Sequence, residues 1–320
     1  MNYNLLIENL TNPALLFFVL GIIAVYLKSD LEIPANSSKF ISLYLLFAIG
    51  FKGGQELSHE AFNAEIAGSI LFGILISLLI PLYTFFILKR KLNVFDAGAI
   101  AAAYGSVSAV TFVTAVSYLE AQQLHFQGHM VAIMALMESP AIVMGLLLIS
   151  ISNKQVGEKM RNLTAIKHSF TNGSVLLIIG SLIIGYLANA KQAEGIKPFT
   201  NDLFKGFLAI FLLDMGITSG KKLKTFFSFG WFPIIFAIVI PLFNGCCVAL
   251  LSSFITNDIT SRFMFSILAA SASYIAVPAA MKISVPKANI GLFLPMALAV
   301  TFPINITIGM PIYFLIVQNT

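Results

Sequence analysis

The stretch ASASYIAVPAAM, residues 270–281, places three hydroxyl groups and a proline inside a long apolar segment. Its proline, Pro278, has no backbone N–H and disrupts a continuous helix. A second stretch, AYGSVSAVTF at residues 103–112, combines small residues and hydroxyls with a helix-weakening glycine, Gly105. The pattern predicts a break in each of two membrane-spanning helices. Each break is followed by a half-helix whose N-terminus faces the middle of the bilayer, with Pro278 in the first turn of the second half-helix.

The composition is that of an integral membrane protein. Of the 320 residues, 58% are hydrophobic and 10% are charged, whereas about 25% of a soluble domain is charged. The formal charge of +5 does not indicate a nucleic-acid partner, because the basic residues form short clusters between apolar runs. Cys246 and Cys247 are adjacent in an apolar run, which favours packing over a disulfide or a metal site. We expect an all-α membrane fold.

A spanning helix needs about 20 mostly apolar residues. If the N-terminus is outside, most lysines and arginines fall into the loops on the inner side, as is usual for membrane proteins. Both termini are therefore predicted to lie on the outer side. Residues 1–12 are interpreted as a short interfacial stretch. The ten candidate spans are residues 13–28, 38–56, 66–88, 96–118, 129–151, 171–189, 203–220, 226–253, 260–283 and 290–317.

The two halves of the chain resemble each other. LLFAIGFKGGQEL at 45–57 matches FLLDMGITSGKKL at 211–223, and Pro140 matches Pro303. Further matches keep the same order along the chain. An odd number of spans in each half predicts inverted repeats, which are typical of secondary transporters. The predicted division is 1–152, an inner linker at 153–170, and 171–320. A duplicated membrane scaffold is the alternative interpretation.

The two predicted breaks favour an anion, because helix N-termini supply free N–H groups and a positive dipole end. No lysine or arginine is close to either break in sequence, so a small, singly charged anion fits better than a polyphosphate. The alternative is that the serines and proline only kink and pack these helices. Gly105 is also a predicted binding residue of the first break. The hydroxyl donors would be Ser106, Ser108, Thr111, Ser271, Ser273 and Tyr274.

Two carboxylates, Glu138 and Asp214, lie inside predicted spans, where a charge is costly and indicates a functional site. Glu138 with nearby hydroxyls such as Ser108 predicts an oxygen-lined Na⁺ site. Thr301 lies near the repeat counterpart of Glu138, and Asn305 follows on the same helix. The predicted Na⁺ ligands are Glu138, Ser108, Thr301, Asn305 and Asp214. Glu138 as a structural partner or a protonated group, and Asp214 as a partner of a neighbouring helix, are the alternatives. The histidines, which fall in loops or at helix ends, are predicted to be solvated: His59, His125, His129 and His168.

The segments LAASASYIAVPAAMKISVPKANIGLF (268–293) and LAVTFPINITIGMPIY (298–313) resemble the cyanobacterial-type sodium-dependent bicarbonate transporter family. GFKGGQEL, AYGSVSAV and MESPAIV in the first half are similar to that family too. The resemblance implies core and gate subdomains, a homotrimer, Na⁺-driven bicarbonate import across a bacterial plasma membrane, and a PII-like cytoplasmic regulator. It implies that the anion contacts the first break at Ser106, Ser108 and Thr111 and the second at Ser271, Ala272, Ser273 and Tyr274.

The chain departs from the family pattern at the first break. The family is closer to Ser-Gly-Ser-Thr, whereas this chain has Ser108-Ala109-Val110-Thr111. A Na⁺- or H⁺-coupled carrier of another small monoanion is therefore the main alternative. The central inner loop is also short, which argues against the PII-like partner. A cation/proton antiporter would need carboxylates at the breaks, and a sensor or scaffold would not depend on the serines.

We expect no enzymatic activity, because no predicted span contains a His pair, a Ser/Lys pair or twin aspartates. No cofactor is expected beyond Na⁺ as the coupling ion.

Overall fold

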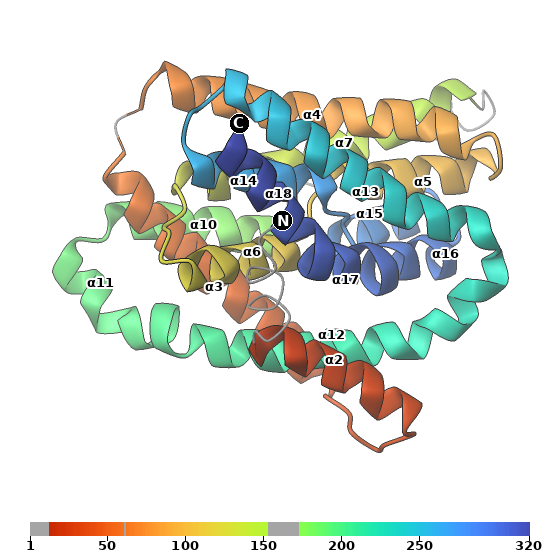
Figure 1. The fold of residues 1–320 in the computed structure, drawn as a ribbon, viewed down its shortest axis with the longest axis horizontal. Helices are drawn as coiled ribbons and strands as arrows, with labels where there is room; N and C mark the ends of the chain where they lie inside the picture. Colours follow the sequence, from red (N-terminus) through yellow and green to blue (C-terminus); the bar gives the residue numbers. More distant parts are fainter. Residues whose placement is uncertain (1–12, 61, 153–172) are drawn as a thin grey trace.

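The structure is a computed structural model that describes residues 13–60, 62–152 and 173–320. Within these ranges the regular structure is entirely helical (Figure 1), which confirms the predicted all-α class. The predicted interfacial stretch 1–12 and the inner linker 153–170 lie outside the described residues. The helices are α2 (Pro13–Tyr26), α3 (Ala35–Ser58), α4 (Ala64–Leu88), α5 (Val94–Gly105), α6 (Ala109–Ala121), α7 (His129–Ser152), α10 (Gly173–Leu187), α11 (Ala190–Lys197), α12 (Phe204–Phe226), α13 (Trp231–Leu251), α14 (Ile259–Ala270), α15 (Ala276–Ser284), α16 (Ile290–Pro295), α17 (Phe302–Ile304) and α18 (Met310–Asn319).

Six helical segments of the described residues are long and apolar enough to cross a membrane. They include Val94–Ala121, which combines α5 and α6, and Ile290–Asn319, which combines α16 to α18. The second of these contains π-helical turns at Met296–Thr301 and Asn305–Gly309. Shorter apolar helices cover Leu15–Tyr26, Leu176–Leu187 and Ile259–Ala270. The remaining predicted span, 38–56, coincides with α3, so every predicted span coincides with a helical segment.

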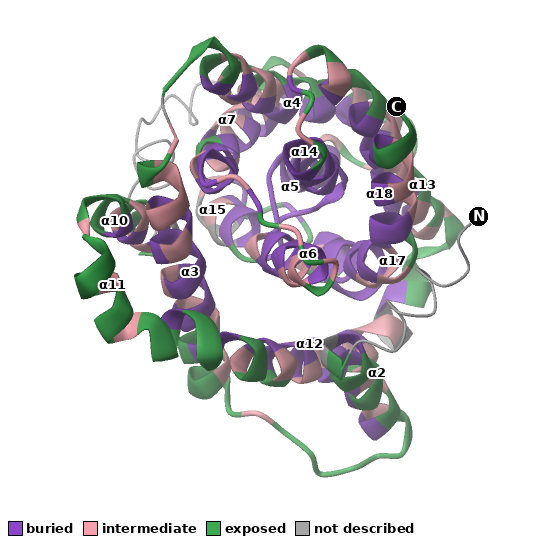
Figure 2. Cartoon of the chain, turned by 60° about the vertical axis from the view of Figure 1, so that its left-hand side comes forward, coloured by how far each residue is buried: buried purple, intermediate pink, exposed green. Residues whose placement is uncertain are grey.

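The broken helices form the centre of the molecule. In Figure 2, α5, α6, α14 and α15 are surrounded by α4, α7, α13 and the C-terminal helices. In the segment Val94–Ala121, 89% of an apolar stretch of 18 residues is buried inside the protein. Small residues allow this close packing: a side chain at Gly98 would meet Ile149, and one at Gly145 would meet Ala102.

A second layer, made of α2, α3, α10 and α12, lies along one side of this centre (Figure 2). Its helices pair as α2 with α12 and α3 with α10. Glycines make both pairs possible. A Cβ atom on Gly216 would lie 2.1 Å from the Phe18 carbonyl oxygen, and one on Gly54 would lie 2.1 Å from that of Leu182. The backbones therefore touch where any larger residue would separate them.

Two boundaries differ from the prediction. The predicted span 226–253 begins instead at Trp231, because α12 continues to Phe226 and the chain turns at Gly230, whose φ is +87°. The predicted outer loop before the span 203–220 contains a short helix, α11. Asn189 and Gln192 form a capping box that starts this helix.

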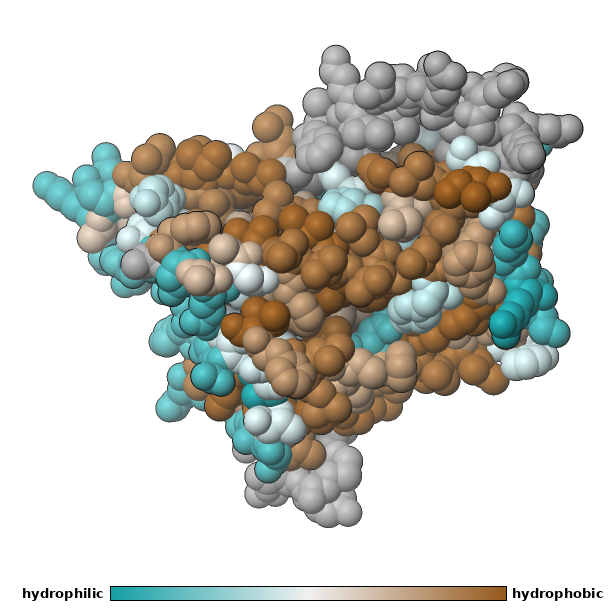
Figure 3. Space-filling model, turned by 90° about the horizontal axis from the view of Figure 1, so that it is seen from above, coloured by the Kyte–Doolittle hydropathy of each residue, from teal (hydrophilic) through white to brown (hydrophobic). Residues whose placement is uncertain are grey.

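Apolar side chains cover much of the molecular surface, and hydrophilic ones gather toward its edges (Figure 3). The exposed large hydrophobic residues include many on α2, α4, α10 and α13. A soluble protein rarely exposes apolar patches of this extent. These helices are therefore suited to contact lipid.

Two basic side chains, those of His129 and Arg262, are buried. His129 is only 7% exposed, and its Nδ1 lies 2.7 Å from the Glu60 carboxylate, so its predicted solvation is wrong. Arg262, at the start of the predicted span 260–283, is 4% exposed within α14. Its guanidinium donates to the carbonyls of Ala249, at the end of α13, and Val317, near the end of α18. A cation stabilises such helix C-termini.

Candidate ion site between the two broken helices

The first break falls at the predicted place. Helix α5 ends at Gly105 and α6 begins at Ala109. Ser108 adopts an extended conformation, and its hydroxyl accepts a hydrogen bond of 3.1 Å from the Thr111 N–H. It is thus the N-cap of α6. The earlier N–H groups of the first turn, those of Ala109 and Val110, have no acceptor within the helix.

The second break also falls at the predicted place. Helix α14 ends at Ala270 and α15 begins at Ala276, with Pro278 in its first turn. Ile275 at the N-cap position offers no side-chain cap. The Ser273 hydroxyl instead accepts a hydrogen bond of 3.3 Å from the Val277 N–H. Pro278 removes no helical hydrogen bond here, because first-turn N–H groups lack an intrahelical partner.

The two breaks satisfy each other's backbone groups. The Ser273 N–H donates to the Ala103 carbonyl of α5 at 2.8 Å. The Ser108 N–H donates to the Ser271 hydroxyl at 3.0 Å, and that hydroxyl donates to the Leu268 carbonyl at 3.0 Å. Unpaired backbone groups are costly away from water. The breaks therefore depend on one another, which neither stretch of sequence reveals by itself.

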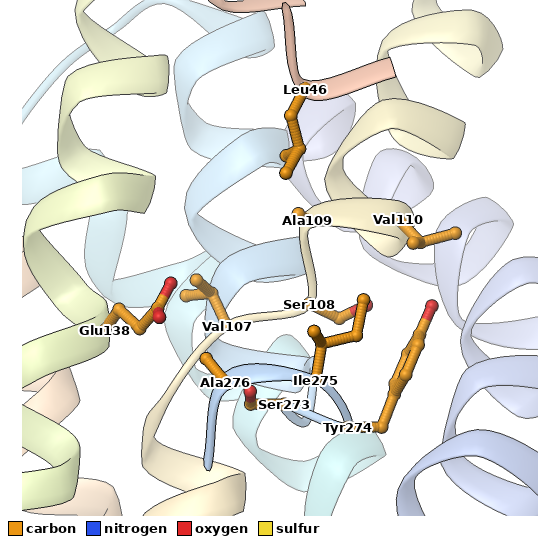
Figure 4. A pocket seen from close by; sticks show the side chains of 10 residues that line it. All are labelled: Leu46, Val107, Ser108, Ala109, Val110, Glu138, Ser273, Tyr274, Ile275 and Ala276. Carbon is orange, nitrogen blue, oxygen red and sulfur yellow. The ribbon is translucent and has the colours of Figure 1, made fainter. Parts of the chain in front are cut away.

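A pocket with an empty volume of about 350 Å³ lies against both breaks. Figure 4 shows Glu138 of α7 on one side of it and Tyr274 on the other, with Ser108 and Ser273 between them. The pocket thus joins two half-helix N-termini, three hydroxyl-bearing residues and one carboxylate. Its lining residues are Leu46, Val107, Ser108, Ala109, Val110, Glu138, Ser273, Tyr274, Ile275 and Ala276.

The other predicted anion-site residues lie beside the pocket. Ser271 connects the breaks through its hydroxyl, and Thr111 contributes its backbone N–H to the cap. Ser106, Thr111 and Ala272 are buried. Gly105, interpreted from the sequence as a helix weakener, has a packing role. A Cβ atom there would lie 2.1 Å from Pro81 Cγ.

Two buried hydroxyls at the breaks have unused hydrogen-bonding capacity. Ser106 Oγ has no partner among the described residues. The Tyr274 hydroxyl faces Ser108 without a well-formed hydrogen bond. A buried polar group without a partner destabilises the fold by about 1–3 kcal/mol. Both hydroxyls are therefore available as donors to a bound anion or to water.

The candidate cation-site residues of the second half are not among the pocket-lining residues. Thr301 donates to the Ala237 carbonyl at 2.7 Å, and its hydroxyl lies 2.8 Å from that of Tyr104. Asn305 donates to the Ala270 carbonyl at 2.7 Å and accepts from Tyr313 at 3.0 Å. These contacts support the end of α14 and its surroundings.

Asp214 lies apart from Glu138. It is on α12, and its carboxylate accepts a hydrogen bond from Ser38 of α3. Asp214 and Ser38 both belong to helices of the second layer, and neither of them lines the pocket.

Sequence reasoning missed two contributors. Leu46 of α3 brings the second layer to the pocket. Asn244 of α13 donates to the Ala269 carbonyl at 3.3 Å and accepts from Tyr83. A lone amide inside an apolar run could have indicated Asn244, whereas nothing distinguishes Leu46 from other leucines in the sequence.

The fold and pocket define a class, a multi-pass helical membrane protein with a polar pocket between two broken helices. A model of the Na⁺-dependent bicarbonate transporter superfamily matches residues 13–318. The chain therefore belongs to the Na⁺-dependent bicarbonate transporter superfamily, which confirms the family predicted from its motifs. A search of curated proteins gave no match. Membership of a transporter family implies transport as the activity.

Proposed function

We propose that this protein imports bicarbonate together with Na⁺ and holds the anion between the N-termini of α6 and α15. One observation carries the proposal: a single pocket is lined by both breaks and by the carboxylate of Glu138. Ser108, Ser273 and Tyr274 supply hydroxyls, and Ala109, Val110 and Ala276 supply first-turn backbone groups. Such termini attract anions through N–H groups and helix dipoles.

The charge of the pocket favours a small monoanion. Its lining residues include no lysine or arginine, so nothing there would neutralise a polyanion. Bicarbonate carries a single charge and can both accept and donate hydrogen bonds, which suits a mixture of N–H and hydroxyl groups. The Ser106 hydroxyl, which has no partner among the described residues, and the Tyr274 hydroxyl beside Ser108 are additional donors near the bound anion.

Glu138 is the proposed coupling residue, with Ser108 as a second Na⁺ ligand. A Na⁺ ion beside Glu138 would offset its repulsion of the anion. Hard cations prefer such carboxylate and hydroxyl oxygens. Moving one negative charge inward against 100 mV requires about 2.3 kcal/mol, and one Na⁺ cancels that charge. Thr301 and Asn305 would then position the half-helices, since their polar atoms are already engaged.

We further propose ten spans arranged as two inverted repeats, with both termini outside a bacterial plasma membrane. The glycine contacts support this arrangement. Gly50 packs against Ile178, and Gly216 packs against Phe18. The glycines differ by 166 in number, which is the offset between the matched stretches 45–57 and 211–223, and their partners differ by 160. A twofold-related architecture produces such reciprocal pairs.

The deciding experiment is uptake of labelled bicarbonate into liposomes with and without an inward Na⁺ gradient. We expect Na⁺-dependent accumulation that falls at least several-fold in Ser273→Ala but not in the control Ser253→Ala, whose hydroxyl lies at the end of α13. Glu138→Gln should weaken the Na⁺ dependence. Folded, oriented protein without Na⁺-dependent uptake would refute bicarbonate symport.

The apolar part of the pocket favours a second candidate, a carrier of another small monoanion. Leu46, Val110 and Ile275 line the pocket and could contact the methyl group of a small carboxylate. Competition of unlabelled acetate, formate and nitrate with bicarbonate in the same liposomes separates the candidates. Stronger competition by acetate than by unlabelled bicarbonate would favour the carboxylate.

A further inference from the structure

A second pocket, with an empty volume of about 690 Å³, lies between α3, α6 and the start of α12. The π-helical turn Pro198–Asp202 borders it as well. Its charged lining residues are Lys52, Glu120, Asp202 and Lys205. The C-terminal end of α6 is there, on the side that we propose to be outside.

The two pockets follow one another along the seam between α3 and α6. Leu46 and Val110 line the first pocket, whereas Ile49 and Val116 line the second. On α6 these positions are about 9 Å apart at 1.5 Å per residue. Leu46, Ile49 and Val116 are each buried, so apolar side chains close the seam between the pockets.

The Glu120 carboxylate connects the helices on both sides of this seam. Glu120 of α6 forms ion pairs with Lys52 of α3 and, at 3.5 Å, with Lys205 of α12. The Lys52 and Glu120 side chains are 21% and 19% exposed, whereas that of Lys205 is 65% exposed. One half-helix of the centre is thereby linked to two helices of the second layer.

Two features weaken the interactions of the Glu120 carboxylate. Glu120 is in the last turn of α6, where the helix dipole disfavours a negative charge. The Lys205 side chain is 65% exposed, so water screens its ion pair with Glu120. Asp202, the remaining charged lining residue, is exposed and therefore screened by water. A competing anion can therefore replace the Glu120 carboxylate most readily at Lys205.

We propose that this second pocket is an outer access site for the transported anion, which displaces the Glu120 carboxylate from Lys52 and Lys205 and so releases α6 from α3 and α12. The proposal rests on the proposed function, because it assigns the same anion class to a site before the central pocket. Bicarbonate presents the same planar pair of oxygens as the carboxylate that it would replace. A small monoanion of this shape therefore fits between the two ammonium groups.

The experiment uses a cysteine at Asn201, an exposed pocket-lining residue, in a Cys246→Ala, Cys247→Ala background. Its labelling by membrane-impermeant anionic and cationic thiosulfonate reagents is measured without any ion gradient. We expect bicarbonate to slow the anionic reagent several-fold. Glu120→Gln should raise the anionic-to-cationic rate ratio several-fold, and Lys205→Gln should abolish protection by bicarbonate. A cysteine at Ser253, outside the pocket, is the control and should be unaffected.

Unchanged Asn201→Cys labelling in bicarbonate, with uptake intact, would overturn the access site. Protection by bicarbonate in a protein that accumulates none would support the access site and contradict the symport. Uptake gives a further readout: Lys205→Gln should raise KM for bicarbonate several-fold while preserving the maximal rate. A loss of maximal rate at unchanged KM would contradict the proposal. Lys205 is the preferred site, because its exposed side chain can change without disturbing the fold.

Discussion

The first break, at residues 106–108, is shorter than the second, at residues 271–275. A serine side chain caps the half-helix after the first break, whereas the half-helix after the second has no side-chain cap at its N-cap residue, Ile275. The carbonyl end of α5 is satisfied by the Ser273 backbone N–H. That of α14 is satisfied by the amide side chains of Asn244 and Asn305.

This difference shows that matched sequences need not be stabilised in the same way. The end of the first broken helix relies on backbone pairing and on close packing at Gly105. The end of the second relies on long polar side chains that come from α13 and the C-terminal helix. Substitutions should therefore affect the two breaks unequally, and four predictions test this asymmetry.

The largest expected effect is that of Gly105→Ala. The new Cβ atom would lie 2.1 Å from Pro81 Cγ and 3.0 Å from the Ser77 carbonyl oxygen. Overpacking of this kind destabilises a protein by about 1–3 kcal/mol, and the rigid ring leaves little room for adjustment. Thermal unfolding in detergent micelles should show a marked fall in Tm. Gly68→Ala, whose Cβ would meet nothing within 4 Å, is the control, and an equal fall in both variants would contradict the packing role.

Asn305→Ala should destabilise the second break by about 2 kcal/mol. It leaves the buried Ala270 carbonyl without its present partner, and it leaves the Tyr313 hydroxyl with only its longer bond of 3.3 Å to the Pro241 carbonyl. Asn244→Ala should have a smaller effect on this carbonyl end, because its bond to Ala269 is longer at 3.3 Å. Asn319→Ala, at the exposed end of α18, is the control. Equal stability of Asn305→Ala and the control would show that the amide cap is dispensable.

The variants Ser271→Ala and Ser106→Ala compare a hydroxyl that joins the two breaks with a hydroxyl that is a proposed anion donor. Ser271→Ala removes the acceptor of the Ser108 N–H and should lower the free energy of unfolding by about 1–2 kcal/mol. Ser106→Ala removes a hydroxyl without a partner among the described residues. It should leave the free energy of unfolding unchanged or raise it by up to about 1–3 kcal/mol, but it should reduce bicarbonate uptake. The reverse order of stabilities would contradict the observed bonding.

The smallest expected effect is that of Pro278→Ala. Pro278 lies in the first turn of α15, where its missing N–H breaks no helical bond. Tm should change by an amount equivalent to less than about 0.5 kcal/mol. A large stability change would mean that the proline itself maintains the second break. An unchanged Tm would assign that role to the bonds between the breaks.

Much of the architecture could be predicted from local sequence. Long apolar runs are helical because lipid requires every backbone group to be paired within the chain. Serine, glycine and proline at 103–112 and 270–281 located the breaks, since this combination of residues is unfavourable in the interior of a helix. The limits of α13 and the presence of α11 were missed, because they depend on a turn at Gly230 and a capping box at Asn189.

The candidate site was predictable only in part. Ser108, Ser273, Tyr274 and Glu138 line one pocket, although Glu138 belongs to a different helix from either break. Asp214 had a similar sequence signal and lies instead against Ser38. Both carboxylates lie in apolar runs of the sequence, and only the tertiary structure places α7 beside the breaks and α12 in the second layer, away from the pocket lining.

The sequence by itself determined that this chain is a helical membrane protein of the bicarbonate transporter superfamily with two interrupted helices. Composition, hydroxyl placement and family motifs are local properties, so they can be read without coordinates. The tertiary structure decided which polar groups are paired and which remain available. Asn305 and Thr301 are engaged in hydrogen bonds, His129 is buried against Glu60, and Ser106 keeps a hydroxyl without a partner among the described residues. The physical reason is that hydrogen-bond satisfaction is set by distances between segments far apart in the chain.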